Sequence, residues 1–221
     1  MNERRLCRSL ALVLYSLCAF LLSDVPAVPA VEPCDDWLTR VVSVQGSVQA
    51  RRASETRWTT LALNDYLCPG DMIRVQENSR AALLLRNEAI IRLDQNTTIT
   101  LPETEISKTI NIDFLSGVAL FFSRFPFSLR IFTPFVNAHI EGTEFLVQVS
   151  QSDTFISVYE GKVHASNQAG GMTLQRGESA AARDGEPPSS RAVMNPRDAV
   201  HWALYYPPIP DRDLDDLVSP T

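Results

Sequence analysis

The side chains that most often carry chemistry are few and scattered in this sequence. The three histidines are His139, His164 and His201, and none has a second His or Cys at the spacing of a metal site. The sequence also lacks a nucleophile elbow and a phosphate-binding glycine loop. Four aspartates in the C-terminal tail lack the glycine and closing glutamate of a calcium loop: Asp211, Asp213, Asp215 and Asp216. We therefore expect no catalytic residue, no metal site and no cofactor.

The first thirty residues predict export. Arg4, Arg5 and Arg8 form a positively charged start, an apolar run covers 9–22, and the small residues of 27–30 close the segment. The apolar run is shorter than the roughly 20 residues that span a membrane. We expect residues 1–30 to be a signal peptide and the protein to be periplasmic, without a membrane span after cleavage. The alternative is an N-terminal anchor that is not cleaved.

Two cysteines, Cys34 and Cys68, remain after such a cleavage, because Cys7 and Cys18 lie within the leader. An even pair in an oxidising compartment predicts a disulfide bond. The loop it closes corresponds to about 3 to 4 kcal/mol of stability in the chain-entropy estimate. The alternative is a pair of free buried thiols.

Residues 31–182 predict one all-β domain. Apolar and polar residues alternate over 106–114, 145–149 and 155–159, which indicates strands with one buried face. The continuous apolar runs at 83–85 and 119–122 favour strands buried on both faces. Turn residues separate these runs, so we predict an antiparallel jelly roll, sandwich or solenoid.

The sequence after this domain predicts three short segments. Residues 183–194 are polar and contain prolines, which is typical of a linker. Asn195 and Pro196 suit the start of a helix over 195–207, which the prolines at its end stop. So short and apolar a helix must dock on the β domain or on another molecule. Residues 208–221 predict an acidic, disordered tail.

Two aromatic clusters are candidate partner contacts. The first contains Phe122 and Phe125, for which packing in the core is the alternative. The second contains Trp202, Tyr205 and Tyr206, residue types that often anchor protein interfaces.

Several short motifs, in their order along the chain, resemble the FecR domain family. They are Pro69-Gly70-Asp71, Asn78-Ser79-Arg80, Ile91-Arg92-Leu93-Asp94, Gly117, Gly142-Thr143-Glu144-Phe145, Val158-Tyr159-Glu160-Gly161-Lys162-Val163 and Leu174-Gln175-Arg176-Gly177-Glu178. The resemblance implies a binding or signalling module of the bacterial envelope and not a catalyst. The segment 198–207 resembles the junction that leads, in longer exported relatives, into tetratricopeptide-type repeats.

The best-known member of this family is a membrane sensor with a cytoplasmic anti-sigma segment. This sequence places no such segment before its apolar run, so we expect only the envelope-domain role to carry over.

The motif residues also have a physical interpretation. We expect Gly70, Gly142, Gly161 and Gly177 to adopt positive φ or to allow close backbone approach. We also expect Asp71 to bond backbone N–H groups in its turn. Thr143 and Phe145 would share one strand face, with Glu144 on the other. We expect Glu144 and Glu160 to pair with backbone or arginine instead of a ligand.

These observations favour a non-catalytic scaffold with a protein partner in the envelope. The alternatives are a polysaccharide- or peptidoglycan-binding β-sandwich and a cupin-like metal enzyme. The formal net charge of −6 disfavours phosphate backbones, so we expect no nucleic-acid partner.

Overall fold

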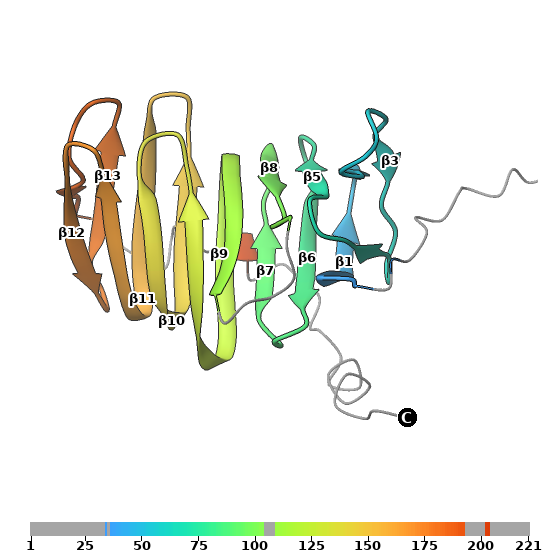
Figure 1. Cartoon of the computed structure of the whole chain (residues 1–221), viewed down its shortest axis with the longest axis horizontal. Helices are drawn as coiled ribbons and strands as arrows, with labels where there is room; N and C mark the ends of the chain where they lie inside the picture. The colour runs from blue at the N-terminus through green and yellow to red at the C-terminus, as the bar shows by residue number, and fades with distance from the viewer. Residues whose placement is uncertain (1–33, 35, 104–108, 193–201, 204–221) are drawn as a thin grey trace, which may run out of the picture. The chain divides into compact units, whose positions relative to one another are not determined.

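The computed structural model describes residues 34, 36–103, 109–192 and 202–203, all within one compact unit that runs from Val31 to Thr221. These residues form a 14-stranded antiparallel sheet, which confirms the all-β prediction for the described part of the chain. Figure 1 shows the strands side by side, in a row that broadly follows the sequence. The strands are β1 (Thr39–Gln45), β2 (Val48–Arg51), β3 (Thr59–Thr60), β4 (Tyr66–Leu67), β5 (Met72–Val75), β6 (Arg80–Leu85), β7 (Ile90–Leu93), β8 (Thr97–Thr100), β9 (Thr109–Phe132), β10 (Asn137–Val149), β11 (Asp153–Asn167), β12 (Gly170–Gln175), β13 (Ser179–Arg183) and β14 (Ser189–Ser190).

The sheet consists of a main path and a branch. The main path runs β14-β13-β11-β10-β9-β7-β6-β1-β4. The branch leaves β9 through β8 and continues through β5 and β2 to β3, while β12 pairs with β11. Both parts therefore meet at the long strand β9.

Strand β9 joins the two parts because different stretches of it have different neighbours. Ser116, Phe114 and Asp113 pair with β8, whereas residues 119–122 pair with β7. Residues 117–122 and 127–132 pair with the two halves of β10, and the register shifts between Gly142 and Glu144. The long strands thus change direction at a few defined positions.

One hydrophobic core lies between the main path and the branch. Leu83, Ile91 and Phe145 of the main path belong to the same buried cluster as Ile73 and Ile99 of the branch. Alternation places every second residue of these strands on this inner face. This arrangement makes the structure a sandwich-like one and fits the predicted fold class.

The main path buries apolar side chains on its other face as well. Leu84, Leu120 and Leu146 point away from the main core, since each lies between two inner-face neighbours on its strand. They belong to two smaller buried clusters that include Trp202 and Ala203. We call this side of the main path the outer face.

The predicted disulfide between Cys34 and Cys68 is present, with 6.1 Å between the two Cα atoms. It ties the start of the described chain to the end of β4.

The predicted C-terminal segments are described only in part. Residues 183–194, predicted as a linker, contain β14, which pairs with β13 through Ser189 and Ser190. Of the predicted helix at 195–207, only Trp202 and Ala203 lie within the described residues, so the helix is not confirmed. The predicted leader and acidic tail lie outside them. Within the described part of the chain, no helix has the length and apolarity needed to cross a membrane.

Candidate functional site

The family motif at Pro69-Gly70-Asp71 holds a turn beside the disulfide. The carboxylate of Asp71, whose residue is 1% exposed, accepts the backbone N–H of Cys68 at 2.8 Å and that of Ala53 at 3.3 Å. The guanidinium of Arg52 donates to the same carboxylate at 2.6 Å. Gly70 lies in the left-handed region at φ +76°. Because every oxygen of this buried carboxylate has a donor, its role is to fix the turn.

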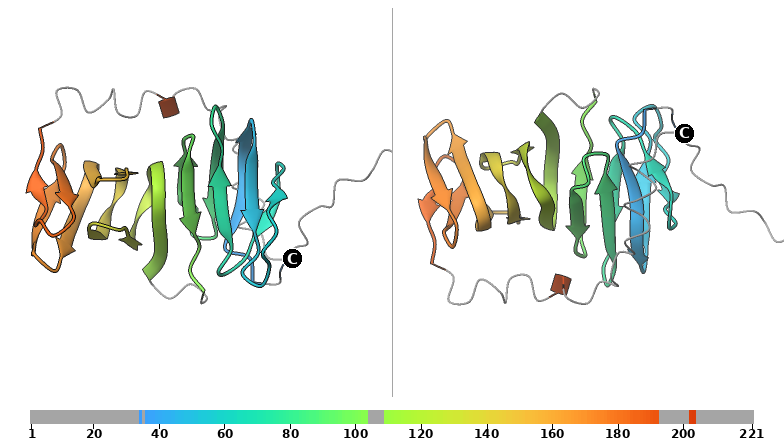
Figure 2. Two further views of the ribbon diagram at one scale, coloured as in Figure 1. Left: turned by 90° about the horizontal axis from the view of Figure 1, so that it is seen from above. Right: turned by 90° about the horizontal axis from the view of Figure 1, so that it is seen from below.

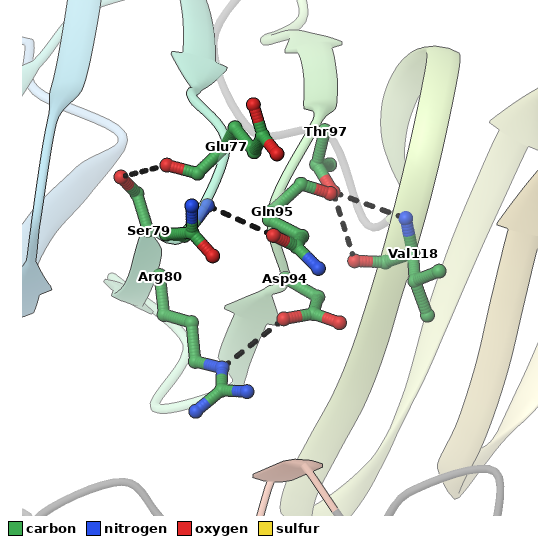
Figure 3. Close-up of polar contacts among 8 residues, drawn as sticks. Glu77, Ser79, Arg80, Asp94, Gln95, Thr97 and Val118 are labelled. Atoms are coloured by element: carbon green, nitrogen blue, oxygen red, sulfur yellow. Dashed lines mark hydrogen bonds and ion pairs between the residues drawn. The ribbon is translucent and has the colours of Figure 1, made fainter.

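The motif Asn78-Ser79-Arg80 ties the turn before β6 to its neighbours (Figure 3). Ser79 Oγ accepts the N–H of Ser47 at 2.8 Å and donates to the carbonyl of Glu77 at 3.0 Å. The backbone N–H of Asn78 donates to the side chain of Gln95 at 2.8 Å. These bonds fix the turn that leads into β6.

Two further residue pairs in Figure 3 join β6 to the turn after β7, and β8 to β9. Arg80 Nε pairs with Asp94 Oδ1 at 3.1 Å. Thr97 Oγ1 bonds both the N–H and the carbonyl of Val118, at 3.0 and 3.1 Å. Gly117 lies at φ +101°, and a Cβ there would collide with Thr97. The backbone of β9 therefore turns at Gly117, where Thr97 replaces the missing strand partner.

The motif around 142–145 contributes to both faces of the sheet. Phe145 is fully buried on the inner face and stacks on Phe121, with 4.7 Å between ring centroids. Glu144 is on the outer face, opposite Glu160 in the β10–β11 register. Gly161 has φ +94°. The side chain of Thr143 is not among those described.

The outer face carries the arrangement that the sequence did not reveal. A cross-strand row runs from Ala82 to Arg92, then to Leu120 and Leu146. Arg92 is the charged member of this apolar row, and its Nη1 donates to the carbonyl oxygen of Ala203 at 2.9 Å. This bond joins residues 111 positions apart and holds Trp202–Ala203 against the sheet.

Trp202 and Ala203 cover the middle of the main path. Ala203 belongs to the cluster of Leu120, Leu146 and Phe155, and Trp202 packs against that cluster and against the one that contains Leu84. In Figure 1 this short red piece lies level with β7 and β9, and Figure 2 places it on one side of the strands. Part of the outer face is thus covered by a segment of the same chain.

Charged groups border the covered area. Burial is the main reason why the pKa of Glu144 is raised above its ordinary value of 4.5, the Glu160 charge raises it further, and the Arg92 charge lowers it. Burial likewise raises the pKa of Tyr159, a hydrogen bond with Ser157 lowers it, and the Glu144 charge raises it. The charges of both an arginine and a second carboxylate therefore act on Glu144.

The predicted aromatic contacts have different positions. Phe122 is on the outer face beside Glu144 and is 40% exposed. Trp202 is half-buried against the sheet and is therefore not a free anchor. The side chain of Phe125 lies outside the described residues, as do Tyr205 and Tyr206.

Two of the histidines lie opposite each other in the sheet, which their spacing in the sequence does not indicate. His139 and His164 are direct cross-strand partners of β10 and β11. His139 lies 3.7 Å from Glu141, and His164 lies 3.2 Å from the Thr173 hydroxyl. Among the described residues, no group of three or more metal-ligating side chains converges. His201 lies outside them.

The fold and the site together define a class of protein: an all-β domain whose motif residues hold its turns and whose second apolar face takes up another segment. Residues 71–164 match the family model described as FecR protein. The chain therefore carries a FecR domain, which confirms the resemblance seen in the motifs.

Two solved structures resemble this one, both of a candidate anti-sigma factor from Parabacteroides distasonis. One has a TM-score of 0.53 at 18% identity and covers 60% of this chain and 64% of that one. The other has a TM-score of 0.49 at 18% identity and covers 54% and 58%. The chain thus spans about three-fifths of the length of these structures, and at this identity the first shows a shared fold alone. No curated protein matches the sequence.

Proposed function

We propose that this protein is a non-catalytic FecR-domain module of the bacterial cell envelope that binds a protein partner as part of a signalling or scaffold assembly. The observation that carries the proposal is the FecR match on a chain whose sheet has a second, apolar face. The described motif residues Asp71 and Ser79 are engaged in turns, whereas the motif residue Arg92 bonds a polypeptide carbonyl on this face, which supports the face as the binding surface.

Two features support export to the envelope. The disulfide Cys34–Cys68 suits an oxidising compartment. Residues 1–30 have the composition of a secretory leader. Cell fractionation followed by non-reducing electrophoresis tests this part: we expect an oxidised, leader-free chain in the periplasmic fraction. A reduced chain in the cytosol with its leader intact would contradict it.

Site-specific cross-linking tests the partner. A photoreactive phenylalanine analogue at Phe122, in the full chain inside the producing bacterium, should yield one defined cross-linked protein. Leu63 is the matched control, since it is also an exposed apolar residue but sits in the turn before β4. Equal cross-linking from both positions, or none from Phe122, would contradict a specific partner on the outer face.

Glycan binding, the main alternative from the sequence, has weaker support. Sugars stack on open aromatic faces, but the ring of Trp58 already has Arg74 over it at 4.2 Å and Arg51 at 5.5 Å. Sedimentation with purified cell walls separates the two functions, and we expect the protein to stay in the supernatant.

A further inference from the structure

We propose that Trp202 and Ala203 are a displaceable intramolecular cover over the binding face of the FecR domain. The inference rests on the proposed function, because it identifies the surface on which a partner would bind. The occupant of that surface in the resting protein is this chain's own C-terminal segment.

The first argument is the apolar character of the covered face. Leu84, Leu120, Leu146 and Phe155 are all buried on the side away from the main core. Without a cover, these side chains would form a contiguous apolar patch of the kind that marks interaction sites. A soluble domain does not keep such a patch on a second sheet face without something to bury it.

The second argument is how the cover is held. Trp202 packs against two side-chain clusters at once, and Ala203 is buried. Arg92 recognises the carbonyl oxygen of Ala203, a group that every polypeptide carries. The recognition chemistry is therefore a bulky aromatic side chain, a small neighbour and a backbone acceptor, which a segment of another protein can also supply.

The third argument is that the cover leaves part of the face open. The Phe122 residue is 40% exposed, and Ile90, its cross-strand partner, is only half-buried. Glu144 and Glu160 lie at the same end of the face. A longer segment with a basic residue would therefore find apolar and electrostatic contacts that Trp202 and Ala203 do not use.

The fourth argument is that no described strand pairing holds the cover in place. The preceding strand β14 has two residues, both exposed, and it ends at Ser190. The residues between Ser190 and Trp202 can span about 35 to 40 Å when extended. Trp202 can thus leave the face without the loss of any strand pairing in β1 to β14.

A peptide with the sequence of residues 195–208 tests the cover in the full chain. We compare its affinity for the wild-type chain and for Trp202→Ala, with circular dichroism to confirm that both are folded. The variant vacates the face, so the peptide should bind it at least about tenfold more tightly than the wild type, a difference of about 1.4 kcal/mol. The same peptide with Ala in place of Trp202 is the control and should not bind.

The charged contact provides a second variant. Adding Arg92→Gln to Trp202→Ala should weaken peptide binding about tenfold or more, because a hydrogen bond from a charged donor is lost. Equal peptide affinity for the wild-type and Trp202→Ala chains, or no binding to either folded chain, would overturn the proposal. A wild-type dimer that Trp202→Ala dissociates, seen by light scattering, would overturn it too, since a second copy would then supply the cover.

This test and the cross-linking test fail independently. The peptide experiment contains no envelope partner, so its failure would leave the proposed function standing. Tight peptide binding together with an empty cross-linking result would instead remove the proposed function and keep the cover.

Discussion

At the residue scale, the structure separates motif residues that hold the fold from those that border the outer face. Asp71 and Ser79 each bond backbone groups of neighbouring turns or strands. Arg92 and Glu144 instead lie on the outer face, where Arg92 bonds Ala203 and the charge of Glu144 interacts with that of Arg92. Most of the described motif residues therefore stabilise the fold, and only a few of them lie where they could contribute to binding.

Replacing Asp71 with Ala should strongly destabilise the protein. The change leaves Arg52, which is largely buried, without its carboxylate and two backbone N–H groups without an acceptor. Breaking a buried pair of this kind costs about 3 to 5 kcal/mol. Denaturant unfolding measures it. Lys162→Ala removes only an exposed partner of Glu141 and should change stability by less than about 1 kcal/mol; equal losses for both variants would contradict the assigned role.

Glu144→Gln should make the protein less sensitive to pH. The folded-state pKa of Glu144 is raised above 4.5, so the folded protein binds more protons than the unfolded one, and this group's contribution to stability falls as pH rises through that folded pKa. The variant should be the more stable protein at neutral pH and should converge with the wild type below pH 4.5. Urea unfolding between pH 4 and 8 measures the difference. Glu141→Gln, at an exposed position, is the control; a steeper pH dependence for Glu144→Gln would contradict the expectation.

At the element scale, β9 determines the architecture. It pairs with β8 on the branch and with β7 and β10 on the main path, so the bend at Gly117 lets one strand serve both. Phe114 and Phe121, on either side of Gly117, both belong to the main buried core.

Gly117→Ala should test that bend. The position combines φ +101° with close contact to Thr97, so the variant needs both a strained backbone and a shift of Thr97. We expect a loss of about 3 kcal/mol or failure to fold. Gly177→Ala has similar strain at φ +84° with open space around it, and should lose about 1 kcal/mol. Thermal melts compare the two, and similar shifts would show that the contact with Thr97 is unimportant.

The strands could be predicted from the sequence because alternation and turn residues are local signals. Residues 145–149 and 155–159 became parts of β10 and β11 for that reason. The run at 83–85 is buried on both faces, as expected, and so are residues 119–121, but the expectation was wrong for Phe122, which is 40% exposed. The branch at β9 and the bond from Arg92 to Ala203 have no local signal, since they join distant parts of the chain.

At the scale of the whole molecule, the disulfide restrains the end of the sheet that contains β1 and β4. Changing Cys34 and Cys68 to Ser together should destabilise the protein by about 3 kcal/mol, because the unfolded chain regains the freedom of a loop with a sequence separation of 34. Unfolding with and without a reducing agent measures this. The reductant should lower wild-type stability to that of the double variant and leave the variant unchanged; an unchanged wild type would contradict it.

The order of the strands also bears on how the protein forms. Among the described strands, β1 pairs with β4 and β6 alone, and both have been synthesised by Leu85. Cys68 lies within the same stretch. A chain that enters a compartment with its amino end first can therefore complete this end of the sheet, crosslink included, while β9 to β11 are still in transit. The open edge of β6 then acts as the template on which β7 and the long hairpins assemble in turn.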